Sequence, residues 1–575
     1  MTATLAPPPQ QRIGPPAASS RAGAPVLFVA LSAFYFAVGT VLVLRYNLFD
    51  PDAPSRVANA GYVFMSRDPH LSAIGFVWNP LPSLAQLPVL LFADWWPALK
   101  THGLAAVVQS ALFMAGAAVM IRRIALDRGL KPLWRWLAVG CFALHPMIVI
   151  YGASGMSEAA EVFCIVWCTR HLLRWVRSRR EGDLAWAGIA LGVGYLARYE
   201  VVVAGAGAAL LVAAVVLYGA QRGQRLAGAT LSVLIVMFPL LTALAAWAIT
   251  GWVVSGELFA TLTSRYGNDH QVDAAMEKAG PLTRAASDNW VVISARILGM
   301  QPFVGIAAAT AVLVGALHRR IDVLVPLATF GPVLAFAAWG QYTSTTFGWF
   351  RFYLLAVPMV VCIALALWPS SGEGATETRG AELGRRLGAT LVTASLLIGF
   401  PVTAWATTDK RIGNQQLQFG LSELGDPQRY PPGELWYRRL MVDDRQLAAY
   451  FDRRNLPDGA VLMDTFNTWG IWLASDDPKQ FLITSDYDFT AALNRPWDFG
   501  VEYIVATSPS LGDSDAVSER YPDMWSDGAG FATLVLSVAG ASGDERFRVY
   551  RVDGEPTPDV DCDLNSPSCP PAAGP

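Results

Sequence analysis

Long runs of apolar residues alternate with short polar connections over residues 1–407 of this 575-residue chain. Most runs approach the roughly 20 residues that a helix needs to cross the hydrocarbon core of a bilayer. The boundary between the fifth and sixth runs depends only on the triplet Arg198-Tyr199-Glu200. The pattern predicts eleven membrane-spanning helices, near residues 25–44, 103–121, 133–151, 158–173, 184–198, 200–218, 227–254, 300–317, 321–340, 351–368 and 387–407.

After residue 407 the chain changes to short apolar runs separated by polar stretches, which is typical of strands and helices in a soluble domain. The sequence therefore predicts a polytopic α-helical membrane protein with a C-terminal extracytoplasmic α/β domain. The expected divisions are a cytoplasmic disordered N-terminus (1–24), a membrane domain (25–407), an α/β domain (408–555) and a Pro-rich tail (556–575).

Composition agrees with this division. The chain is 53% hydrophobic and only 15% charged, against about 25% charged residues in ordinary soluble domains. Its hydrophobicity excludes a disordered protein, its six cysteines exclude a disulfide-dense scaffold, and its net charge of −3 argues against a nucleic-acid partner. Residues 408–575 hold 14 basic and 27 acidic residues, whereas residues 1–407 hold 29 and 19.

The basic residues also predict an orientation. The N-terminus and the connections after every second span hold 19 Lys and Arg, and the opposite connections hold 8. Positive charge marks the cytoplasmic side of a membrane, so we expect a multi-pass plasma-membrane protein with a cytoplasmic N-terminus. Cys562 and Cys569 would then lie outside the cell, where we expect them to form a disulfide.

The loop after the first span carries two carboxylates in the sequence Asp50-Pro51-Asp52, followed by Arg56. Ionisable groups near membrane spans are candidates for function, but Asp-Pro-Asp is also favourable turn chemistry. For Asp52 a functional role is the main interpretation and the turn is the alternative. For Asp50 the turn is the main interpretation and a functional role is the alternative.

Glu158 begins the fourth predicted span, directly after Ser157. Ser157 would cap this helix and leave Glu158 in the first turn, where the helix dipole favours an acid. The alternative is that Glu158 is a second acid facing the same outer cavity as Asp52. Arg198 and Arg351 stand at outer span ends, where a guanidinium either binds phosphate or reaches the interface as a snorkelling side chain.

Two further outer segments contribute candidates. Residues 77–97 are apolar but interrupted by three prolines, which predicts an interfacial helix rather than a span. The loop at 255–299 is long enough to cover a site. Its His270 has no second histidine at metal-ligand spacing, so a surface position is the main interpretation and substrate binding the alternative.

Together these features resemble the GT-C superfamily of membrane glycosyltransferases. The resemblance rests on an acid in a long first outer loop, an acid opening the fourth span, the Arg-Tyr-Glu turn at 198–200 and the late Arg-Phe-Tyr…Pro span at 351–358. The general type is the polyprenyl-phosphate-sugar-dependent group related to bacterial aminoarabinose transferases and protein mannosyltransferases. The resemblance covers residues 25–407.

The resemblance implies that Asp52 or Asp50 is the catalytic base and that Glu158 is a further catalytic acid. The family's adjacent pair of carboxylates is absent, because Pro51 separates the two aspartates, so both remain candidates for the base. Candidate substrate-binding residues are Arg56, Arg198, Glu200, Arg351, Tyr353 and His270.

The expected reaction is inverting transfer of a sugar from a polyprenyl-phosphate donor, within the membrane lipid, to an extracytoplasmic glycan, lipid or protein. The arginines or a divalent cation (Mg²⁺ or Mn²⁺) would neutralise the leaving phosphate. Two alternatives are a transporter or flippase of lipid-linked saccharides and a non-catalytic scaffold of envelope assembly. A transporter would more often carry polar groups at mid-membrane and an internal repeat.

Overall fold

A computed structural model describes residues 18–555, apart from 220–224, 265, 279–288, 369–378, 410, 414, 427, 432–433, 512–514 and 541–542. The predicted N-terminal segment up to residue 17 and the tail with Cys562 and Cys569 lie outside these residues. The chain divides into two compact units. The membrane unit comprises Met1–Gly61 and Ile74–Leu440, and the C-terminal unit comprises Tyr62–Ala73 and Met441–Pro575.

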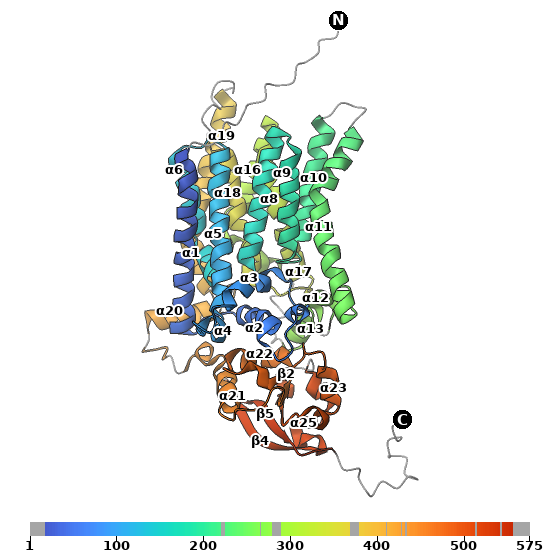
Figure 1. The fold of residues 1–575 in the computed structure, drawn as a ribbon. Coiled ribbons are helices and arrows are strands. Elements are labelled where there is room, and N and C mark those ends of the chain that lie inside the picture. Colours follow the sequence, from blue (N-terminus) through green and yellow to red (C-terminus); the bar gives the residue numbers. More distant parts are fainter. Residues whose placement is uncertain are drawn as a thin grey trace. The chain divides into compact units, whose positions relative to one another are not determined.

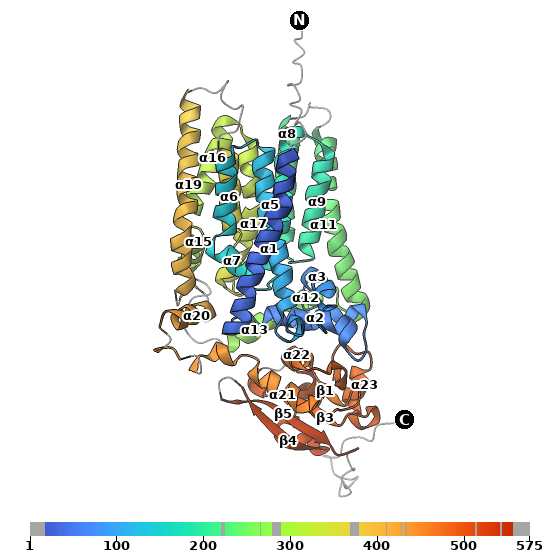
Figure 2. The same ribbon diagram turned by 60° about the vertical axis from the view of Figure 1, so that its left-hand side comes forward.

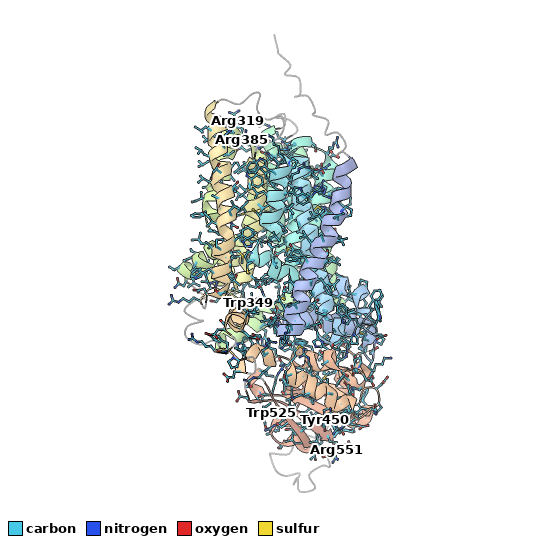
Figure 3. The ribbon with its side chains drawn as sticks, turned by 90° about the vertical axis from the view of Figure 1, so that its left-hand side faces the viewer. Arg319, Trp349, Arg385, Tyr450, Trp525 and Arg551 are labelled. Carbon is cyan, nitrogen blue, oxygen red and sulfur yellow. The ribbon has the colours of Figure 1, made fainter. Side chains whose placement is uncertain are left out.

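The membrane unit is a bundle of long helices that run alongside one another (Figures 1 and 2). Arg319 and Arg385 lie at one end of the bundle and Trp349 lies toward the other (Figure 3). The helices of the bundle are α1 (Ala18–Tyr46), α5 (Leu104–Asp127), α6 (Pro132–Ala143), α7 (Pro146–Ala153), α8 (Glu158–Ser178), α9 (Glu181–Tyr195), α10 (Val201–Gly219), α11 (Arg225–Ser255), α15 (Trp290–Met300), α16 (Val304–His318), α17 (Val325–Tyr342), α18 (Ala356–Leu367) and α19 (Arg379–Thr408).

Shorter helices occupy the connections. Residues 77–97, predicted to form an interfacial helix, contain the 10-residue apolar helix α3. The short elements of this unit are α2 (Asp52–Met65, which continues into the C-terminal unit), α3 (Leu81–Leu90), α4 (Ala98–Thr101), α12 (Ala260–Thr263), α13 (Asn268–Lys278), α20 (Gln415–Gly425) and the 3₁₀ helices η2 (Ile321–Leu324), η3 (Phe350–Tyr353) and η5 (Trp436–Arg439).

Among the described residues, seven helices are long and apolar enough to cross a membrane, or up to nine if each of two bent pairs is one span. The bent pairs are α6 with α7, at 61°, and α15 with α16, at 77°. The other two predicted spans are also helices, but α8 carries five charged side chains and α9 has only 15 residues. The predicted count of eleven spans is therefore not confirmed.

The segment that follows the last span belongs to the membrane unit, whereas the sequence placed its start at the boundary of the α/β domain. The Asn47 side-chain amide donates to the carbonyls of Tyr437 and Leu440, at 2.9 and 3.1 Å. Arg438 and Tyr437 both donate to the Glu423 carboxylate. These contacts hold Tyr437 and Leu440 against the end of α1, and the division between the units falls after Leu440.

The C-terminal unit contains a five-stranded mixed sheet in the order β2-β1-β3-β5-β4. Strands β1, β2 and β3 are parallel, and β5 runs antiparallel to both β3 and β4. One side of the sheet packs in a core that includes Leu462, Ile504 and Tyr550. The strands are β1 (Val461–Met463), β2 (Phe481–Ile483), β3 (Tyr503–Thr507), β4 (Ala532–Ala539) and β5 (Glu545–Val552), and the main helices are α21 (Val442–Asp452), α22 (Thr465–Ala474), α23 (Phe489–Asn494) and α24 (Ala516–Arg520).

Candidate active site

The loop between α1 and α2 turns at the Asp-Pro-Asp sequence. Oδ1 of Asp50 accepts a hydrogen bond from the backbone N–H of Asp52, at 3.3 Å, and this closes the turn. Asp52 is the first residue of α2. Its carbonyl accepts a hydrogen bond from Nη1 of Arg56 one helical turn later, at 3.0 Å. The turn therefore leaves the second oxygen of Asp50 and the whole Asp52 carboxylate available for other contacts.

A second turn, between α7 and α8, brings Glu158 to the same region. Gly155 has φ +80°, and a Cβ there would lie 2.7 Å from Cβ of Ala106 and 3.1 Å from Cβ of Ala53. Only glycine allows both this backbone conformation and the close approach to α2 and α5. The hydroxyl of Ser110 fixes the turn by accepting from the Gly155 N–H, at 2.9 Å.

Ser157 precedes α8, but its side chain makes no capping hydrogen bond to the helix. Its hydroxyl instead accepts from Nη1 of Arg198, at 3.3 Å. Glu158 is in the first turn of α8 and its side chain is only 3% exposed. The predicted capping role thus does not apply to Ser157, and the buried charge of Glu158 needs cationic partners.

Arg351 provides the first of these partners. Its Nε lies 3.2 Å from Oε1 of Glu158, and its Nη2 lies 3.0 Å from Oδ2 of Asp52. Its Nη1 donates to Oδ2 of Asp50. One guanidinium, 6% exposed, therefore joins three carboxylates that come from two segments far apart in the sequence.

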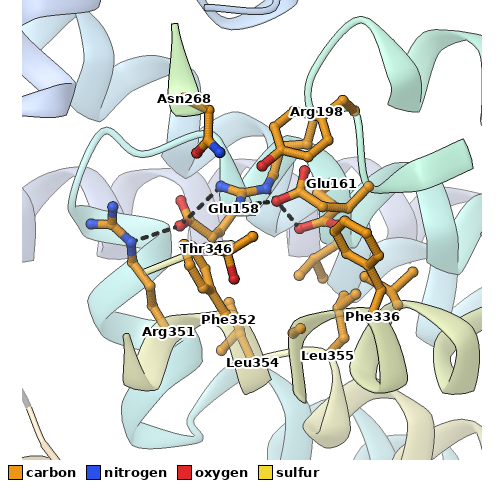
Figure 4. A pocket seen from close by; sticks show the side chains of 15 residues that line it. Glu158, Glu161, Arg198, Asn268, Phe336, Thr346, Arg351, Phe352, Leu354 and Leu355 are labelled. Atoms are coloured by element: carbon orange, nitrogen blue, oxygen red, sulfur yellow. Dashed lines mark hydrogen bonds and ion pairs between the residues drawn. The ribbon is translucent and has the colours of Figure 1, made fainter. Parts of the chain in front are cut away.

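Arg198 provides the second partner (Figure 4). Its Nη1 lies 3.2 Å from Oε1 of Glu158, its Nε lies 3.3 Å from Oε2 of Glu161, and its Nη2 donates to Oε1 of Glu200, at 2.6 Å. Glu158 is thus shared by both arginines. The result is one continuous network of five carboxylates and two guanidinium groups, with Arg56 bound to the Asp52 carbonyl at its side.

Aromatic rings cover two of the guanidinium groups. Cζ of Arg351 lies 4.0 Å from the ring centre of Trp349, and Cζ of Arg56 lies 4.2 Å from that of Trp78. Cation–π contacts of this kind hold the planes of the guanidinium groups while leaving their edges free for hydrogen bonds.

Two neighbouring pockets open onto the network. The larger spans about 660 Å³, open solvent included, and is lined by Asp52, Arg56, Trp78, Arg198, Trp349 and Arg351, among others. The smaller spans about 500 Å³, open solvent included, and is lined by Glu158, Glu161, Arg198 and Arg351, together with apolar residues of α17 and the two leucines before α18. Asp52 and Asp50 remain 24% and 25% exposed, so solvent or a ligand can reach both carboxylates.

The surroundings of Asp50 change the pKa of its carboxyl. Burial raises the pKa of its carboxyl to about 6, although Arg351 acts in the opposite direction. Asp50 therefore combines the predicted turn function with a place in the ion-pair network.

Two of the predicted site residues lie elsewhere. Tyr353 is buried, and its hydroxyl donates to Oε1 of Gln341, at 2.8 Å, on α17. His270 is an exposed residue of α13. Neither residue lines the two pockets described above. Asp50, Asp52, Arg56, Glu158, Arg198, Glu200 and Arg351 are brought together.

The network also contains residues that were not singled out from the sequence. Glu161 follows Glu158 by one helical turn on α8, and this spacing places both carboxylates on one helix face. Trp349 lies two residues before Arg351 and could have been found by its position. Trp78 could not have been found from its position, because it contacts Arg56, which belongs to a separate segment of the chain.

The predicted divalent cation does not fit this cluster. The space between the carboxylates of Asp50, Asp52 and Glu158 is taken by the guanidinium of Arg351. In the described part of the chain, no three His, Cys, Asp or Glu side chains form a group that could hold a metal ion. The positive charge at this site is supplied by the chain itself.

No known protein-family profile matches the chain, and no curated protein matches its sequence. Solved structures of an oligosaccharyltransferase from Archaeoglobus fulgidus are similar to it. One, tethered with an acceptor peptide, is 12% identical over 90% of this chain and 74% of its own, with a TM-score of 0.37. Another, named AglB and bound to an inhibitory peptide and a dolichol-phosphate, is 11% identical over 96% and 76%, with a TM-score of 0.35.

A third structure of the same oligosaccharyltransferase, in complex with Zn and sulfate, is 14% identical over 91% of this chain and 72% of its own, with a TM-score of 0.38. At TM-scores below 0.5 and identities of 11–14%, this likeness carries no argument about the fold or the activity of this chain. Any activity of this chain must therefore be inferred from its own residues.

Proposed function

We propose that this chain is an inverting membrane glycosyltransferase that moves a sugar from a polyprenyl-phosphate donor to an extracytoplasmic acceptor. The observation that carries the proposal is that Arg351 joins Asp52 and Glu158 in one network, with Asp52 and Arg351 in the wall of one pocket. Glycosyl transfer needs a base for the acceptor and positive charge for the leaving phosphate. Both kinds of group are present in that wall.

Asp52 is the proposed base. Its Oδ2 is held by Arg351, and no described residue donates a hydrogen bond to its Oδ1. The carboxylate is thus oriented by one oxygen and presents the other to the pocket. Asp50 is less suitable, because the turn uses one of its oxygens and Arg351 uses the other.

Arg56 is the proposed ligand of the donor phosphate. It is 4% exposed and lines the larger pocket, and the only hydrogen bond that its guanidinium makes to a described residue is to the Asp52 carbonyl. Its Nε is buried without a hydrogen-bond partner. Arg198 and Arg351 differ because their guanidinium groups are paired with carboxylates: Nε of Arg198 lies 3.3 Å from Oε2 of Glu161, and Nε of Arg351 lies 3.2 Å from Oε1 of Glu158.

In the proposed reaction, Oδ1 of Asp52 takes the proton of the acceptor hydroxyl as its oxygen attacks the anomeric carbon. The new carbon–oxygen bond forms on the face opposite the phosphate, and the old bond breaks with its electron pair on the departing polyprenyl phosphate. Attack from the opposite face inverts the anomeric configuration. The acceptor is a glycan, a lipid or a protein.

The unequal distribution of basic residues supports a site on the extracytoplasmic side. The connections at the end opposite to Asp52 are rich in arginine, and positive charge marks the cytoplasmic side. A lipid-linked donor suits that location because it keeps its tail in the bilayer and needs no nucleotide.

The proposal is tested with purified protein and a panel of radiolabelled polyprenyl-phosphate sugars. We expect Asp52→Asn to lower kcat by a factor of about 10²–10⁴, the usual contribution of a positioned base. Asp94→Asn, which changes an exposed aspartate of the same unit, is the matched control. Full activity in Asp52→Asn, or no transfer by the unchanged protein from any donor, contradicts the proposal.

Arg56→Ala gives an independent test of the phosphate assignment. Loss of a charged hydrogen bond costs about 1.5–3 kcal/mol, so KM for the donor should rise by roughly tenfold to a hundredfold. Arg56→Lys should recover only part of this loss, because an ammonium lacks the planar fork of donors. An unchanged donor KM in Arg56→Ala would assign the phosphate to another residue.

A further inference from the structure

The smaller of the two pockets beside the ion-pair network contains polar groups that the proposed reaction does not use. Asp52 and Arg56 lie in the wall of the larger pocket and not in that of the smaller one. The smaller pocket is lined instead by three carboxylates, those of Glu158, Glu161 and Glu200. Because Glu200 lines both pockets, the two adjoin.

Two of these carboxylates each have an oxygen without a partner in the described part of the chain. Glu158 is almost completely buried, and both arginines approach it at Oε1, at 3.2 Å. Its Oε2 is buried and accepts no hydrogen bond. Glu200 accepts from Arg198 at Oε1, at 2.6 Å, whereas its Oε2 is also buried without a hydrogen-bond partner. A buried acceptor that is left unfilled costs free energy, so these two oxygens indicate a site for the O–H or N–H groups of a ligand.

The two arginines in the wall of this pocket are already paired. Arg198 binds the three carboxylates of the pocket, one at each of its nitrogens. Arg351 binds Glu158 through one nitrogen and the two aspartates of the first outer loop through the others. Carboxylates outnumber guanidinium groups among the lining residues by three to two. An anionic group that entered the pocket would therefore meet like charge, which is costly where groups are desolvated.

The other lining residues suit a sugar ring. The hydroxyl of Thr346 is buried, has no hydrogen-bond partner among the described residues, and belongs to the same wall as Glu158 (Figure 4). The rings of Tyr199, Phe336 and Phe352 line the pocket as well. A sugar carries hydroxyl groups, which donate to carboxylates, and C–H groups on its faces, which pack against aromatic rings. Apolar walls with a few convergent polar groups are typical of small-molecule sites.

We propose that the smaller pocket holds the sugar that is transferred, and that Glu158 and Glu200 select a sugar without an acidic group by accepting hydrogen bonds from its hydroxyls. The inference rests on the proposed function, in which the donor phosphate binds to Arg56 in the adjoining pocket. A uronic acid would bring its own carboxylate against the unfilled oxygens of Glu158 and Glu200, and this repulsion excludes it. The selection acts on the charge of the sugar and does not depend on the acceptor.

Matched pairs of donors test the selection. Each pair consists of a polyprenyl-phosphate hexose and the corresponding hexuronate on the same lipid, so that the two differ only in the acidic group. With the unchanged protein we expect kcat/KM for the hexuronate to be lower by about a hundredfold or more, because like charges are brought together in a desolvated pocket. Equal use of the two donors, or a preference for the hexuronate, overturns the inference.

Glu200→Gln tests the assignment of the residue. The amide oxygen of the variant can still accept from Arg198, but its amide nitrogen replaces the unfilled acceptor with a donor. We expect kcat/KM for the hexose to fall by about tenfold, and the preference for the hexose over the hexuronate to fall by about tenfold or more. Partial unfolding does not change this preference, because both donors are compared in one preparation. Glu257→Gln, at an exposed glutamate of the same unit, is the matched control, and an unchanged preference in Glu200→Gln or an equal change in Glu257→Gln contradicts the assignment.

Thermal unfolding distinguishes failure of this inference from failure of the proposed function. A ligand that binds the native protein raises its melting temperature, so the hexose donor should raise it more than the hexuronate donor at the same concentration. Glu200→Gln should reduce this difference. Absence of transfer from every donor, with the difference retained, would refute the proposed function and support a pocket that selects the sugar. Transfer without any difference between the paired donors would refute this inference alone.

Discussion

Arg351 and Glu158 are joined by a contact of 3.2 Å between Nε and Oε1, although they are 193 positions apart in the sequence. Arg351 belongs to η3, just before α18, and Glu158 begins α8. The contact therefore ties two helix starts together at one end of the bundle. Both side chains are almost completely buried, so both charges depend on the ion-pair network that also includes Arg198, Asp50 and Asp52.

We predict that Arg351→Ala destabilises the membrane unit by about 3–5 kcal/mol, the cost of leaving buried carboxylates without their partner. Transfer activity should be lost. Arg351→Lys should recover part of the stability but little activity, since an ammonium cannot bind three carboxylates in the geometry of a guanidinium. Thermal unfolding and transfer assays measure the two effects, and a fully active Lys variant would show that the fork geometry is unimportant.

Much of this cluster could be predicted from the sequence. Asp52, Glu158, Arg198 and Arg351 stand at predicted span ends, and the alternation of charge between the connections predicts one side of the membrane for all four. Tyr353 could not be placed in this way, since sequence position does not fix where a side chain points. Its hydroxyl reaches Gln341 on α17 instead of the pocket.

The bounds of the two units could not be predicted from the sequence either. Arg67 pairs with Asp486, a residue 419 positions later, and no local pattern indicates a contact of that range. The bend between α6 and α7 had a visible cause, since Pro146 begins α7 and a proline at the first helical position starts a new helix. The continuous apolar run over residues 133–151 nevertheless predicted a single span.

Transfer activity should not depend on divalent cations. The guanidinium of Arg351 lies between the carboxylates that would otherwise bind such an ion. We expect protein treated with EDTA to retain its activity within about a factor of two, and added Mg²⁺ or Mn²⁺ to have no larger effect, because charge stabilisation by fixed donors replaces that by a metal. Loss of activity on chelation, restored by one of these ions, would contradict this assignment.

The stability of the C-terminal unit should fall as the pH rises from 5 to 7.5. Burial raises the pKa of Asp444 to about 6, although Arg546 acts in the opposite direction. Because the native pKa exceeds the ordinary value of about 3.9, the stabilising contribution of the protonated form is present below pH 4 and is lost as the pH passes 6. Linkage predicts that the titration of Asp444 lowers the free energy of unfolding by about 1 kcal/mol between pH 5 and 7.5.

Hydrogen exchange of the β1 and β3 amides, corrected for intrinsic pH dependence, measures that loss. In Asp444→Asn the side chain keeps an acceptor for Nη1 of Arg546, which lies 2.8 Å from Oδ2 of Asp444, but it no longer titrates. We expect a weaker pH dependence in this variant. Asp498→Asn, at a carboxylate that is 52% exposed, should leave the dependence unchanged, and an equal effect of both substitutions would refute the explanation.

Gly155→Ala should damage both folding and activity, because the added methyl group would meet Ala106 and Ala53 at 2.7 and 3.1 Å. Gly129→Ala is the matched control, since Gly129 also has a positive φ, of +66°, but no atom lies within 4 Å of the added Cβ. Both substitutions carry the conformational penalty of a left-handed backbone, about 1 kcal/mol, and only Gly155→Ala adds overpacking of about 1–3 kcal/mol. Since Ala53 follows Asp52 directly, Gly155→Ala should also lower kcat per folded protein, whereas Gly129→Ala should not. Equal melting temperatures and equal kcat in the two variants would mean that the turn at Gly155 does not position α2.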